Sequence, residues 1–331
     1  MSISFKEDHI SQIPALLMLE KLGYTYLTPD EALALRGGNL ANVLLEPVLR
    51  KQLAAINVVQ VSSVRTTVFS EQNITAGIEA LRNIPMDEGF MEASQTVYDL
   101  LTSGKTLEQI VDGDRKSFVM QYIDWKNPRN NVFHVTEEFA VSRTGMTETY
   151  RPDIVLFVNG IPLCVIECKR PDVKDSIEQA ISQHLRNQKA DGIRSLYLYS
   201  TLLLAINRQE GSYATTATPE KFWARWREQF ADREEEARYR QERERVVNEP
   251  LLDDKLFGER FGYVRRNFEE LYKQPVTPSV QDEYLYNLCR PERLLQLMYG
   301  FTLYDDGIKK LCSFFSFLIL NLRKGYASCN I

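Results

Sequence analysis

Residues 151–171 read RPDIVLFVNGIPLCVIECKRP, and the fold can be inferred outward from them. Their two apolar runs meet at Asn159 and Gly160, a pair of residues that tolerate positive φ and favour a tight hairpin turn. Strands that are apolar on both faces usually lie in the centre of a sheet. We therefore expect two adjacent, buried strands joined by this turn.

Three charged residues stand at the open end of the expected hairpin. Asp153 lies seven residues before Gly160, and Glu167 lies seven after it. Pairing across a three-residue loop places the two carboxylates side by side, and a register shift of one residue leaves them neighbours. Lys169 follows Glu167 by two residues and shares its face of the strand. We expect the two acids and the lysine to converge.

Two interpretations of this cluster are open. Carboxylates directly opposite each other destabilise a sheet, and a divalent cation between them would relieve that cost. The alternative is a structural ion pair of Lys169 with one of the acids, with Arg151 or Arg170 as further partners, at a strand end close to water. The order Pro152-Asp153 and then Glu167-Cys168-Lys169 is similar to the PD-(D/E)xK motif of nucleases, which favours the metal.

Helical and strand patterns alternate on both sides of the hairpin. Apolar residues at helical spacing predict helices, and β-branched or alternating runs predict strands. The helical patterns cover 13–22, 40–55, 74–81, 94–101, 107–110 and 175–188, and the strand patterns cover 58–68, 131–143, 195–201 and 202–207. This order predicts an α/β domain that extends to about residue 215.

The chain changes character after residue 215. Residues 220–247 form a dense run of mixed charge, typical of a solvated helix with i,i+4 ion pairs. A PVTP segment at 275–278 interrupts the chain, and 283–299 is again helical in pattern. A helical C-terminal extension is therefore expected.

Composition limits the possible functions. The 331 residues carry a formal net charge of −5, so contact with nucleic acid requires local basic patches. The five cysteines form no CxxC pair and indicate neither a disulfide framework nor a zinc site. The N-terminus lacks a signal-peptide pattern, and the longest apolar run, 311–322, is about half of a membrane span. We expect a cytoplasmic protein that has no contact with membranes.

The wider sequence resembles one family. Residues 151–171 closely resemble the segment around the nuclease site of type I restriction enzyme R subunits, as do LGYTYLTPDEALALRGG at 22–38 and LLEPVLRKQLAAIN at 44–57. The resemblance covers most of 10–215. It extends weakly through 289–310, which is similar to the segment that leads into the family's motor domain.

This resemblance implies a fold and an activity. The fold is a restriction-endonuclease-like core, in which helices flank a central mixed sheet. The activity is Mg²⁺-dependent hydrolysis of DNA, with Asp153, Glu167 and the backbone carbonyl of Cys168 as metal ligands. Lys169 would orient the attacking water or stabilise the developing charge. The implied partners are DNA and the modification and specificity subunits of a type I complex.

Two positions depart from the family pattern. Members often add a glutamate from the first helix as a fourth ligand, where this chain has Gln12, and Glu20 is a candidate substitute. Many members carry Gln-x-x-x-Tyr on the helix after the hairpin. Gln183 matches this element and is a candidate catalytic residue, whereas Asn187 departs from it. His184 is expected to be a surface or packing residue rather than a catalytic base.

Three parts follow from the resemblance: a nuclease domain at 1–215, a charged helical spacer at 216–270, and a partial lead-in to a motor domain at 271–331. After about residue 311 the sequence departs from the family, as a truncation or frameshift would cause. The P-loop-like residues 103–106 fail as an ATP site, because the motif needs glycine where Asp99 stands. Gly104 is instead expected to cap a helix, and ATP is expected only for the full-length enzyme.

Two rival functions stay open at this stage. The chain could be catalytically silent and dock DNA or the modification subunits, since no motor motif follows and Asn187 departs from the pattern. It could also be a stand-alone repair nuclease, because a fold does not determine a function. The sequence does not indicate the DNA target or the oligomeric state.

Overall fold

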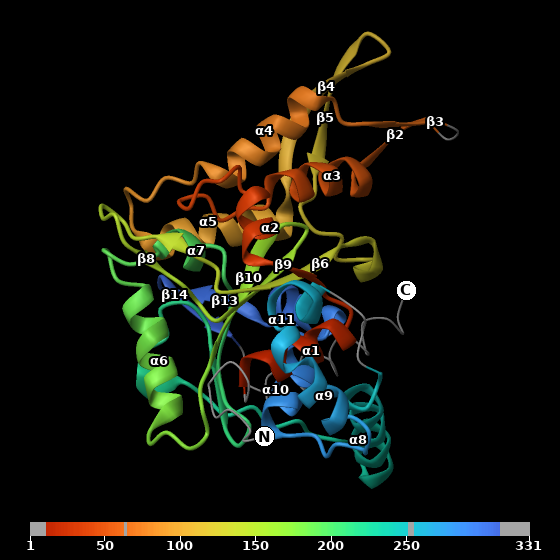
Figure 1. The fold of residues 1–331 in the computed structure, drawn as a ribbon. Coiled ribbons are helices and arrows are strands. Elements are labelled where there is room, and N and C mark those ends of the chain that lie inside the picture. The colour runs from red at the N-terminus through yellow and green to blue at the C-terminus, as the bar shows by residue number, and fades with distance from the viewer. Residues whose placement is uncertain (1–10, 63–64, 251–254, 312–331) are drawn as a thin grey trace.

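The computed structural model describes residues 11–62, 65–250 and 255–311. At its centre is a six-stranded mixed sheet with the order β1-β6-β9-β10-β11-β12 (Figure 1). β1 is parallel to β6 and β10 is parallel to β11, while the other neighbours are antiparallel. The predicted α/β class with a mixed sheet is confirmed. The strands are β1 (Thr25–Leu27), β6 (Phe133–Glu137), β9 (Ile154–Val158), β10 (Ile161–Cys168), β11 (Leu202–Ile206) and β12 (Gly211–Ala214).

The β9–β10 hairpin lies in the buried middle of this sheet, as predicted. Every residue of both strands is buried. Asn159 and Gly160 have positive φ angles of 52° and 83°. The turn has two residues rather than the expected three, because Val158 pairs directly with Ile161.

A β-bulge corrects the register of the hairpin. The pairing shifts by one residue just before Cys164, and Ile166 then lies opposite Ile154. This shift adds one residue to β10. It restores the register expected for Asp153 and Glu167, although the predicted loop length is wrong.

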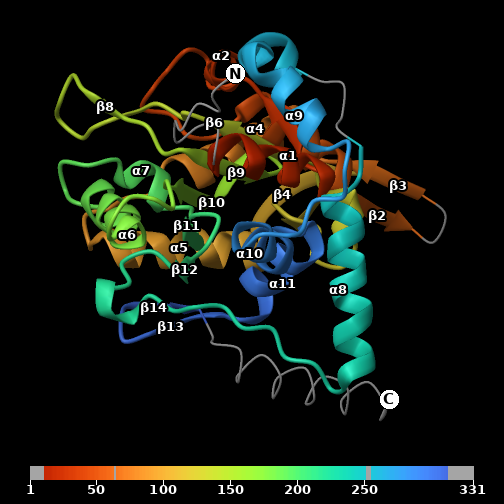
Figure 2. The same cartoon turned by 60° about the horizontal axis from the view of Figure 1, so that its bottom comes forward.

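Helices cover both faces of the sheet. α6 (Ser176–Asn187) packs on β10 and β11, while α1 (Ile13–Lys21) packs on β6 and α10 (Val280–Cys289) packs on β12. Figures 1 and 2 show α6 on one side of the sheet and α1 with α10 on the other. Further helices are α2 (Pro29–Ala34), α3 (Glu46–Ile56), α4 (Glu71–Arg82), α5 (Phe90–Ser103), α7 (Arg194–Tyr197), α8 (Arg233–Val247), α9 (Arg265–Leu271) and α11 (Pro291–Gly300).

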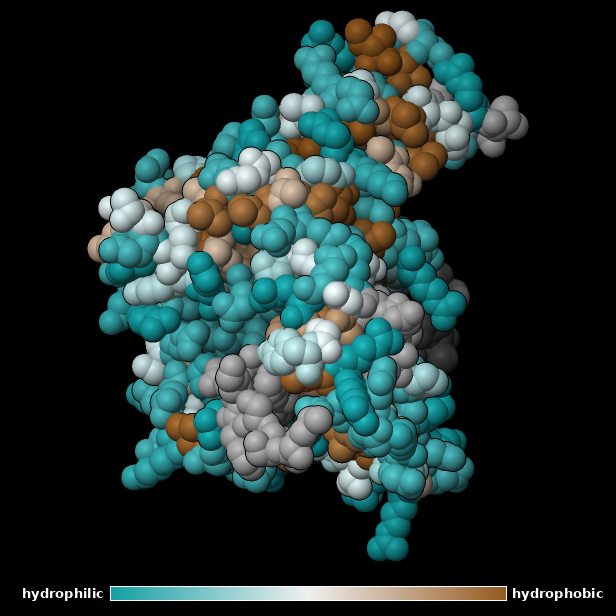
Figure 3. Space-filling model, viewed as in Figure 1, coloured by the Kyte–Doolittle hydropathy of each residue, from teal (hydrophilic) through white to brown (hydrophobic). Residues whose placement is uncertain are grey.

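Two hairpins project from the body beside α3 and α4 (Figure 1, top). They are β2 (Val58–Ser62) with β3 (Arg65–Val68), and β4 (Lys105–Val111) with β5 (Asp114–Met120). The prediction of a helix at 107–110 is wrong, because these residues belong to β4 and every residue of β4 pairs with β5. Figure 3 shows hydrophobic side chains on this projecting part, where Ile110 and Val119 are exposed.

The strand expected at 195–201 is also wrong, because this segment contains α7. Leucine and tyrosine alternate here, but all four of residues 196–199 are buried, so the pattern does not separate an inner from an outer face. The strand expected at 131–143 stops at Glu137, since Glu138 takes a left-handed φ of 50°. A separate short hairpin of β7 (Val141–Ser142) and β8 (Thr149–Tyr150) follows.

Three expected helices have different bounds in the structure. The helix expected at 40–55 begins at Glu46, with proline in its first turn. The charged helix expected from 220 begins at Arg233, where Asp232 caps it by accepting a hydrogen bond from the Glu235 amide. The helix expected at 283–299 is divided into α10 and α11 at Pro291, because proline has no amide hydrogen for a continuous helix.

The C-terminal extension packs on the first helix. The Nζ atom of Lys21 donates to the carbonyl oxygen of Val247 at 2.6 Å, and Ser11 Oγ donates to Gln281 Oε1 at 2.9 Å. One cluster of buried apolar side chains contains residues from Ile13 to Phe301. The domain boundaries at 215 and 270 stay predictions. Within the described ranges no helix has the length and apolarity needed to cross a bilayer, and the expected atypical tail lies outside them.

A buried lysine lies in the hairpin of β13 (Thr302–Asp305) and β14 (Ile308–Leu311). Lys309 Nζ donates to the Ser200 carbonyl at 3.0 Å and to Thr201 Oγ1 at 3.2 Å. Burial lowers the pKa of Lys309 to about 7. Between pH 7 and its ordinary pKa, the unfolded chain therefore holds a proton that the folded chain lacks, so folding stability rises with pH in this range.

We expect Lys309→Met to stabilise the fold by about 2 kcal/mol more at pH 7 than at pH 9. The Ser200 carbonyl keeps a second donor in this variant, because Thr216 Oγ1 lies 2.8 Å away. The measurement is denaturant unfolding of both proteins at the two pH values. Lys310→Met, an exposed change on the same strand, serves as the control. A stability difference independent of pH would contradict the expectation.

Candidate active site

Asp153 and Glu167 meet at one end of the central hairpin. Glu167 is the second-last residue of β10, and Asp153 directly precedes β9. The pairing of Ile166 with Ile154 makes the two acids the next pair along the ladder. The predicted convergence of the two carboxylates is therefore present in the structure.

Hydrogen bonds hold the Asp153 carboxylate in place. Asp153 Oδ2 accepts from the Cys168 amide at 2.7 Å and from Lys169 Nζ at 3.3 Å. The same Nζ donates to the Cys168 carbonyl at 3.0 Å. The lysine ammonium therefore touches two of the three groups that were expected to bind a metal. The ion pair named as the structural alternative is part of the same arrangement.

Glu167 is a fully buried acid with one unsatisfied oxygen. Gln183 Nε2, from α6, donates to Glu167 Oε2 at 2.5 Å, while Oε1 has no hydrogen-bond partner within the described ranges. Burial raises the pKa of the Glu167 carboxyl well above its ordinary value, and the Asp153 carboxylate raises it further. The charges of Lys169 and Arg186 act in the opposite direction. A cation beside Oε1 would satisfy this oxygen.

The oxygen atoms at this strand end suit a hard divalent cation. Mg²⁺ is typically bound through one or two carboxylates and keeps several waters. Among the described residues no group of three or more His, Cys, Asp or Glu side chains could hold a metal ion. A cation here would therefore be held by Asp153, Glu167 and the Cys168 carbonyl. The unsatisfied Oε1 of Glu167 is compatible with such an ion.

The two candidates for the fourth ligand lie in different places. Gln12 Nε2 donates to the Asp153 carbonyl oxygen at 3.0 Å, so this amide lies beside the site. Glu20 lies eight residues farther along, which is about 12 Å on a helix. Its charge raises the pKa of Tyr26, together with burial and Glu137. Gln12 is the nearer of the two residues to Asp153.

His184 anchors α6 to the sheet. Its Nε2 lies 3.0 Å from the Leu204 carbonyl, which can only accept, so Nε2 carries the proton and Nδ1 accepts from the Tyr197 hydroxyl at 3.0 Å. Burial lowers the pKa of the imidazole to about 4. Both ring nitrogens are thus engaged within the core. This geometry agrees with the packing role expected for His184 and holds Gln183 in register with Glu167.

Asn187 and Tyr197 were not connected by the sequence. Asn187 Nδ2 lies 3.5 Å from the Tyr197 hydroxyl, and both side chains are buried. Tyr197 belongs to α7 and lies near Glu167, whose charge adds to the effect of burial in raising the tyrosine pKa. The sequence feature that could have drawn attention to Tyr197 is the SLYLYS pattern at 195–200, which instead led to the prediction of a strand.

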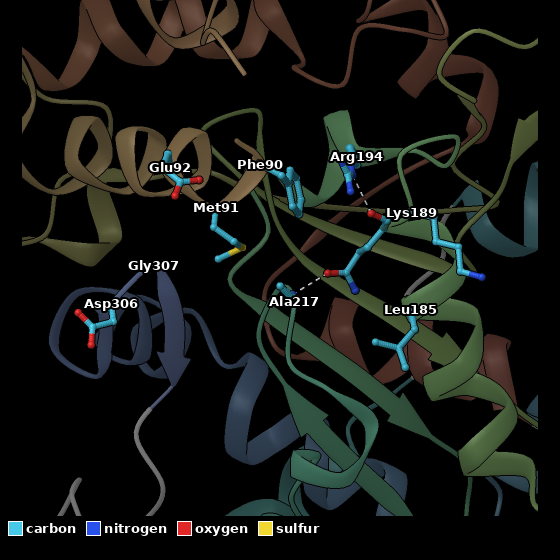
Figure 4. Close-up of a pocket in the computed structure, with 10 residues that line it drawn as sticks. Phe90, Met91, Glu92, Leu185, Lys189, Arg194, Ala217, Asp306 and Gly307 are labelled. Carbon is cyan, nitrogen blue, oxygen red and sulfur yellow. Dashed lines mark hydrogen bonds between the residues drawn. The ribbon is translucent and has the colours of Figure 1, made fainter. Parts of the chain in front are cut away.

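A hollow of about 600 Å³ lies apart from the carboxylates (Figure 4). It opens between the start of α5, the end of α6 and the β13–β14 turn. Acidic and basic residues both line it, among them Glu92, Asp306, Lys189 and Arg194. Its lining includes none of the predicted site residues. The hollow therefore does not mark the candidate active site.

The rejected P-loop also has a different structure. Gly104 ends α5 with a φ of 79°, as expected, and the residues after it form β4. A P-loop would instead join a strand to the start of a helix.

Comparison with known proteins identifies the family. A family model described as type I restriction enzyme R protein N terminus matches residues 4–222, more than half of the chain. The chain belongs to this family. This R-protein region is 27% identical over 228 residues to a Methanocaldococcus jannaschii protein named "Putative type I restriction enzyme MjaIXP endonuclease subunit". It is 29% identical over 206 residues to the type I restriction enzyme HindI endonuclease subunit of Haemophilus influenzae.

These relatives are much longer than this chain. The matched segments cover 66% and 60% of this chain but only 20% and 18% of the two relatives. Both matches therefore concern about a fifth of a larger subunit. The resemblance seen in residues 10–215 is confirmed at the level of the family.

Proposed function

We propose that this R-protein region is a metal-dependent endodeoxyribonuclease, and that it acts within a type I restriction-modification complex. The observation that carries the proposal is the buried Glu167 carboxylate, which has an unsatisfied Oε1 and lies close enough to Asp153 and Lys169 for their charges to shift its pKa. Buried acids need neutralisation, and Lys169 supplies a single positive charge on the Asp153 side of the pair. The endonuclease names of the relatives support the same reaction.

Each residue of the cluster has a separate task in the proposed reaction. A divalent cation, when bound, supplies Lewis-acid stabilisation of the phosphate and a more acidic water. Asp153, Glu167 and the Cys168 carbonyl would hold that cation. Lys169 Nζ, held beside Asp153, would orient the water or stabilise charge on the phosphate oxygens. Gln183 keeps the Glu167 carboxylate in the orientation that binding requires.

The proposed fold is the restriction-endonuclease-like core, and the proposed partners are DNA and the modification and specificity subunits. The mixed sheet with an acidic strand end supports that fold assignment. The family match supports the partners, since R proteins are components of type I enzymes. ATP use is proposed only for a full-length subunit.

Removal of the metal tests the proposal directly. We expect the purified chain to nick supercoiled plasmid in Mg²⁺ or Mn²⁺ without ATP, and to leave it intact in excess EDTA. Cutting that persists in EDTA would exclude metal-dependent chemistry. Intact plasmid under both conditions would favour the silent docking function, provided that the metal binds.

Metal binding is measured separately. We expect Asp153→Asn to weaken Mn²⁺ binding at least about tenfold, because one of the two carboxylates is lost, as for other changes at metal sites. Calorimetric titration of DNA-free protein gives the affinity. Glu148→Gln changes an exposed acid of the β7–β8 loop and serves as a matched control. Equal affinity in the parent and both variants would remove Asp153 from the metal site.

A further inference from the structure

Two arginines beside the carboxylates lack an acidic partner. Arg186 lies on α6, one helical turn after Gln183, and its positive charge lowers the pKa of Glu167 against the effect of burial. Arg151 lies two residues before Asp153. Both side chains are exposed, and within the described ranges neither forms an ion pair with a carboxylate. The charge of Arg151 lowers the pKa of the half-buried Glu138, against the effects of burial and Asp153. Neither arginine is held in an ion pair, so both can contact an anionic ligand.

Arg186 is held in one orientation by its neighbours. Its guanidinium lies over the Tyr150 ring, 4.4 Å from the centroid. Its Nε and Nη2 atoms donate to Asn187 Oδ1 at 3.3 and 3.1 Å. Nη1 forms no hydrogen bond with the protein in the described ranges, so its two protons remain for a ligand. Asn187, which departs from the family pattern, thus helps to position the Arg186 guanidinium in this chain.

Tyr150 is itself held from a second direction. The Arg143 guanidinium lies over the same ring at 4.7 Å, and its Nη2 atom pairs with Asp191 at 2.6 Å. The charge of Arg143 is thereby neutralised, whereas that of Arg186 is not. The Tyr150 ring therefore supports the Arg186 guanidinium. Tyr150 also directly precedes Arg151 in the sequence.

We propose that Arg151 and Arg186 bind the DNA phosphate backbone beside the scissile bond, with Tyr150 and Asn187 positioning Arg186. This inference rests on the proposed function, because it names the surface by which that site would receive DNA. The whole chain has a net charge of −5 and cannot attract DNA through its overall charge. Two guanidinium groups near the carboxylates that form no ion pair supply the local attraction that a phosphate backbone requires.

The test is the salt dependence of binding to a short DNA duplex in Mg²⁺. The variants are made in the Lys169→Met background, electrophoresis after each titration shows whether the duplex is still intact, and fluorescence anisotropy gives the affinity. We expect Arg151→Gln and Arg186→Gln each to reduce the slope of log K against log salt by about 1, since each removes one phosphate contact. Arg186→Lys keeps the charge and should keep the slope.

A matched control separates this surface from general charge effects. Arg238→Gln removes the same charge from α8, where Arg238 pairs with Glu234 at 3.5 Å, and should leave the slope unchanged. Unchanged slopes for Arg151→Gln and Arg186→Gln would overturn the inference. Reduced slopes with undiminished cleavage by Lys169→Met would uphold the DNA surface and reject the proposed catalytic site.

Discussion

Lys169→Met is expected to reduce metal-dependent plasmid cleavage by a hundredfold to a thousandfold, about the loss seen when one transition-state donor is removed. Lys169 Nζ lies 3.3 Å from Asp153 Oδ2 and 3.0 Å from the Cys168 carbonyl, at the proposed metal site. The ammonium repels cations and is not a metal ligand. Mn²⁺ binding should therefore persist in this variant. The measurement combines initial nicking rates with a Mn²⁺ titration.

Two further variants make this result specific. Lys174→Met removes a lysine that is 91% exposed in the loop before α6, and it should cut at the parental rate. Lys169→Arg keeps a positive charge but changes its shape, so we expect partial activity. Nicking by Lys169→Met within twofold of the parent would contradict the assigned role. Loss of both cleavage and Mn²⁺ binding would indicate that the lysine mainly supports the fold of the site.

Gly160→Ala is expected to destabilise the fold by about 3 kcal/mol. Gly160 has a φ of 83°, a conformation that costs alanine energy by itself. A methyl group there would also lie 2.6 Å from the Leu45 carbonyl oxygen and 3.1 Å from the Leu49 amide nitrogen. These backbone atoms cannot move away cheaply, because Leu45 also donates its amide hydrogen to the Gly160 carbonyl at 2.9 Å. Denaturant unfolding measures the loss.

Gly113 is a control for the cost of the left-handed backbone conformation without any steric clash. It has a φ of 86° in the β4–β5 turn, and a methyl group at this position would meet no atom within 4 Å. Gly113→Ala should therefore cost only the left-handed conformation, about 1 kcal/mol. Equal losses at the two glycines would show that the packing of the hairpin turn against α3 contributes little. A larger loss at Gly160 would show that the turn is anchored by that contact.

The site residues on the hairpin could be predicted because they are local. Asn159 and Gly160 favour a turn by their own conformational preferences, and the spacing to Asp153 and Glu167 then follows from strand geometry. The register was right even though the turn was not. The bulge before Cys164 adds the residue that the shorter turn omits. Neither the bulge nor the two-residue turn could be distinguished in advance, because the surrounding residues are apolar throughout.

The contacts of α6 could not be predicted in the same way. Tyr197 bonds to His184, and Arg186 lies against Tyr150, although these partners are 13 and 36 residues apart in sequence. Periodicity describes which face of an element is apolar. It does not show which other element that face will contact. Residues 196–199 are all buried, so their pattern of leucine and tyrosine indicates no single apolar face.

By itself, the sequence determined the α/β class, the buried hairpin, and the convergence of two acids and a lysine, because short-range backbone preferences and side-chain alternation specify them. The tertiary structure alone decided that Glu167 keeps an unsatisfied oxygen, that Gln183 orients it, and that Arg186 is held free of any acidic partner within the described residues. These properties depend on packing between distant segments, where burial and the available hydrogen-bond partners are set by the whole fold.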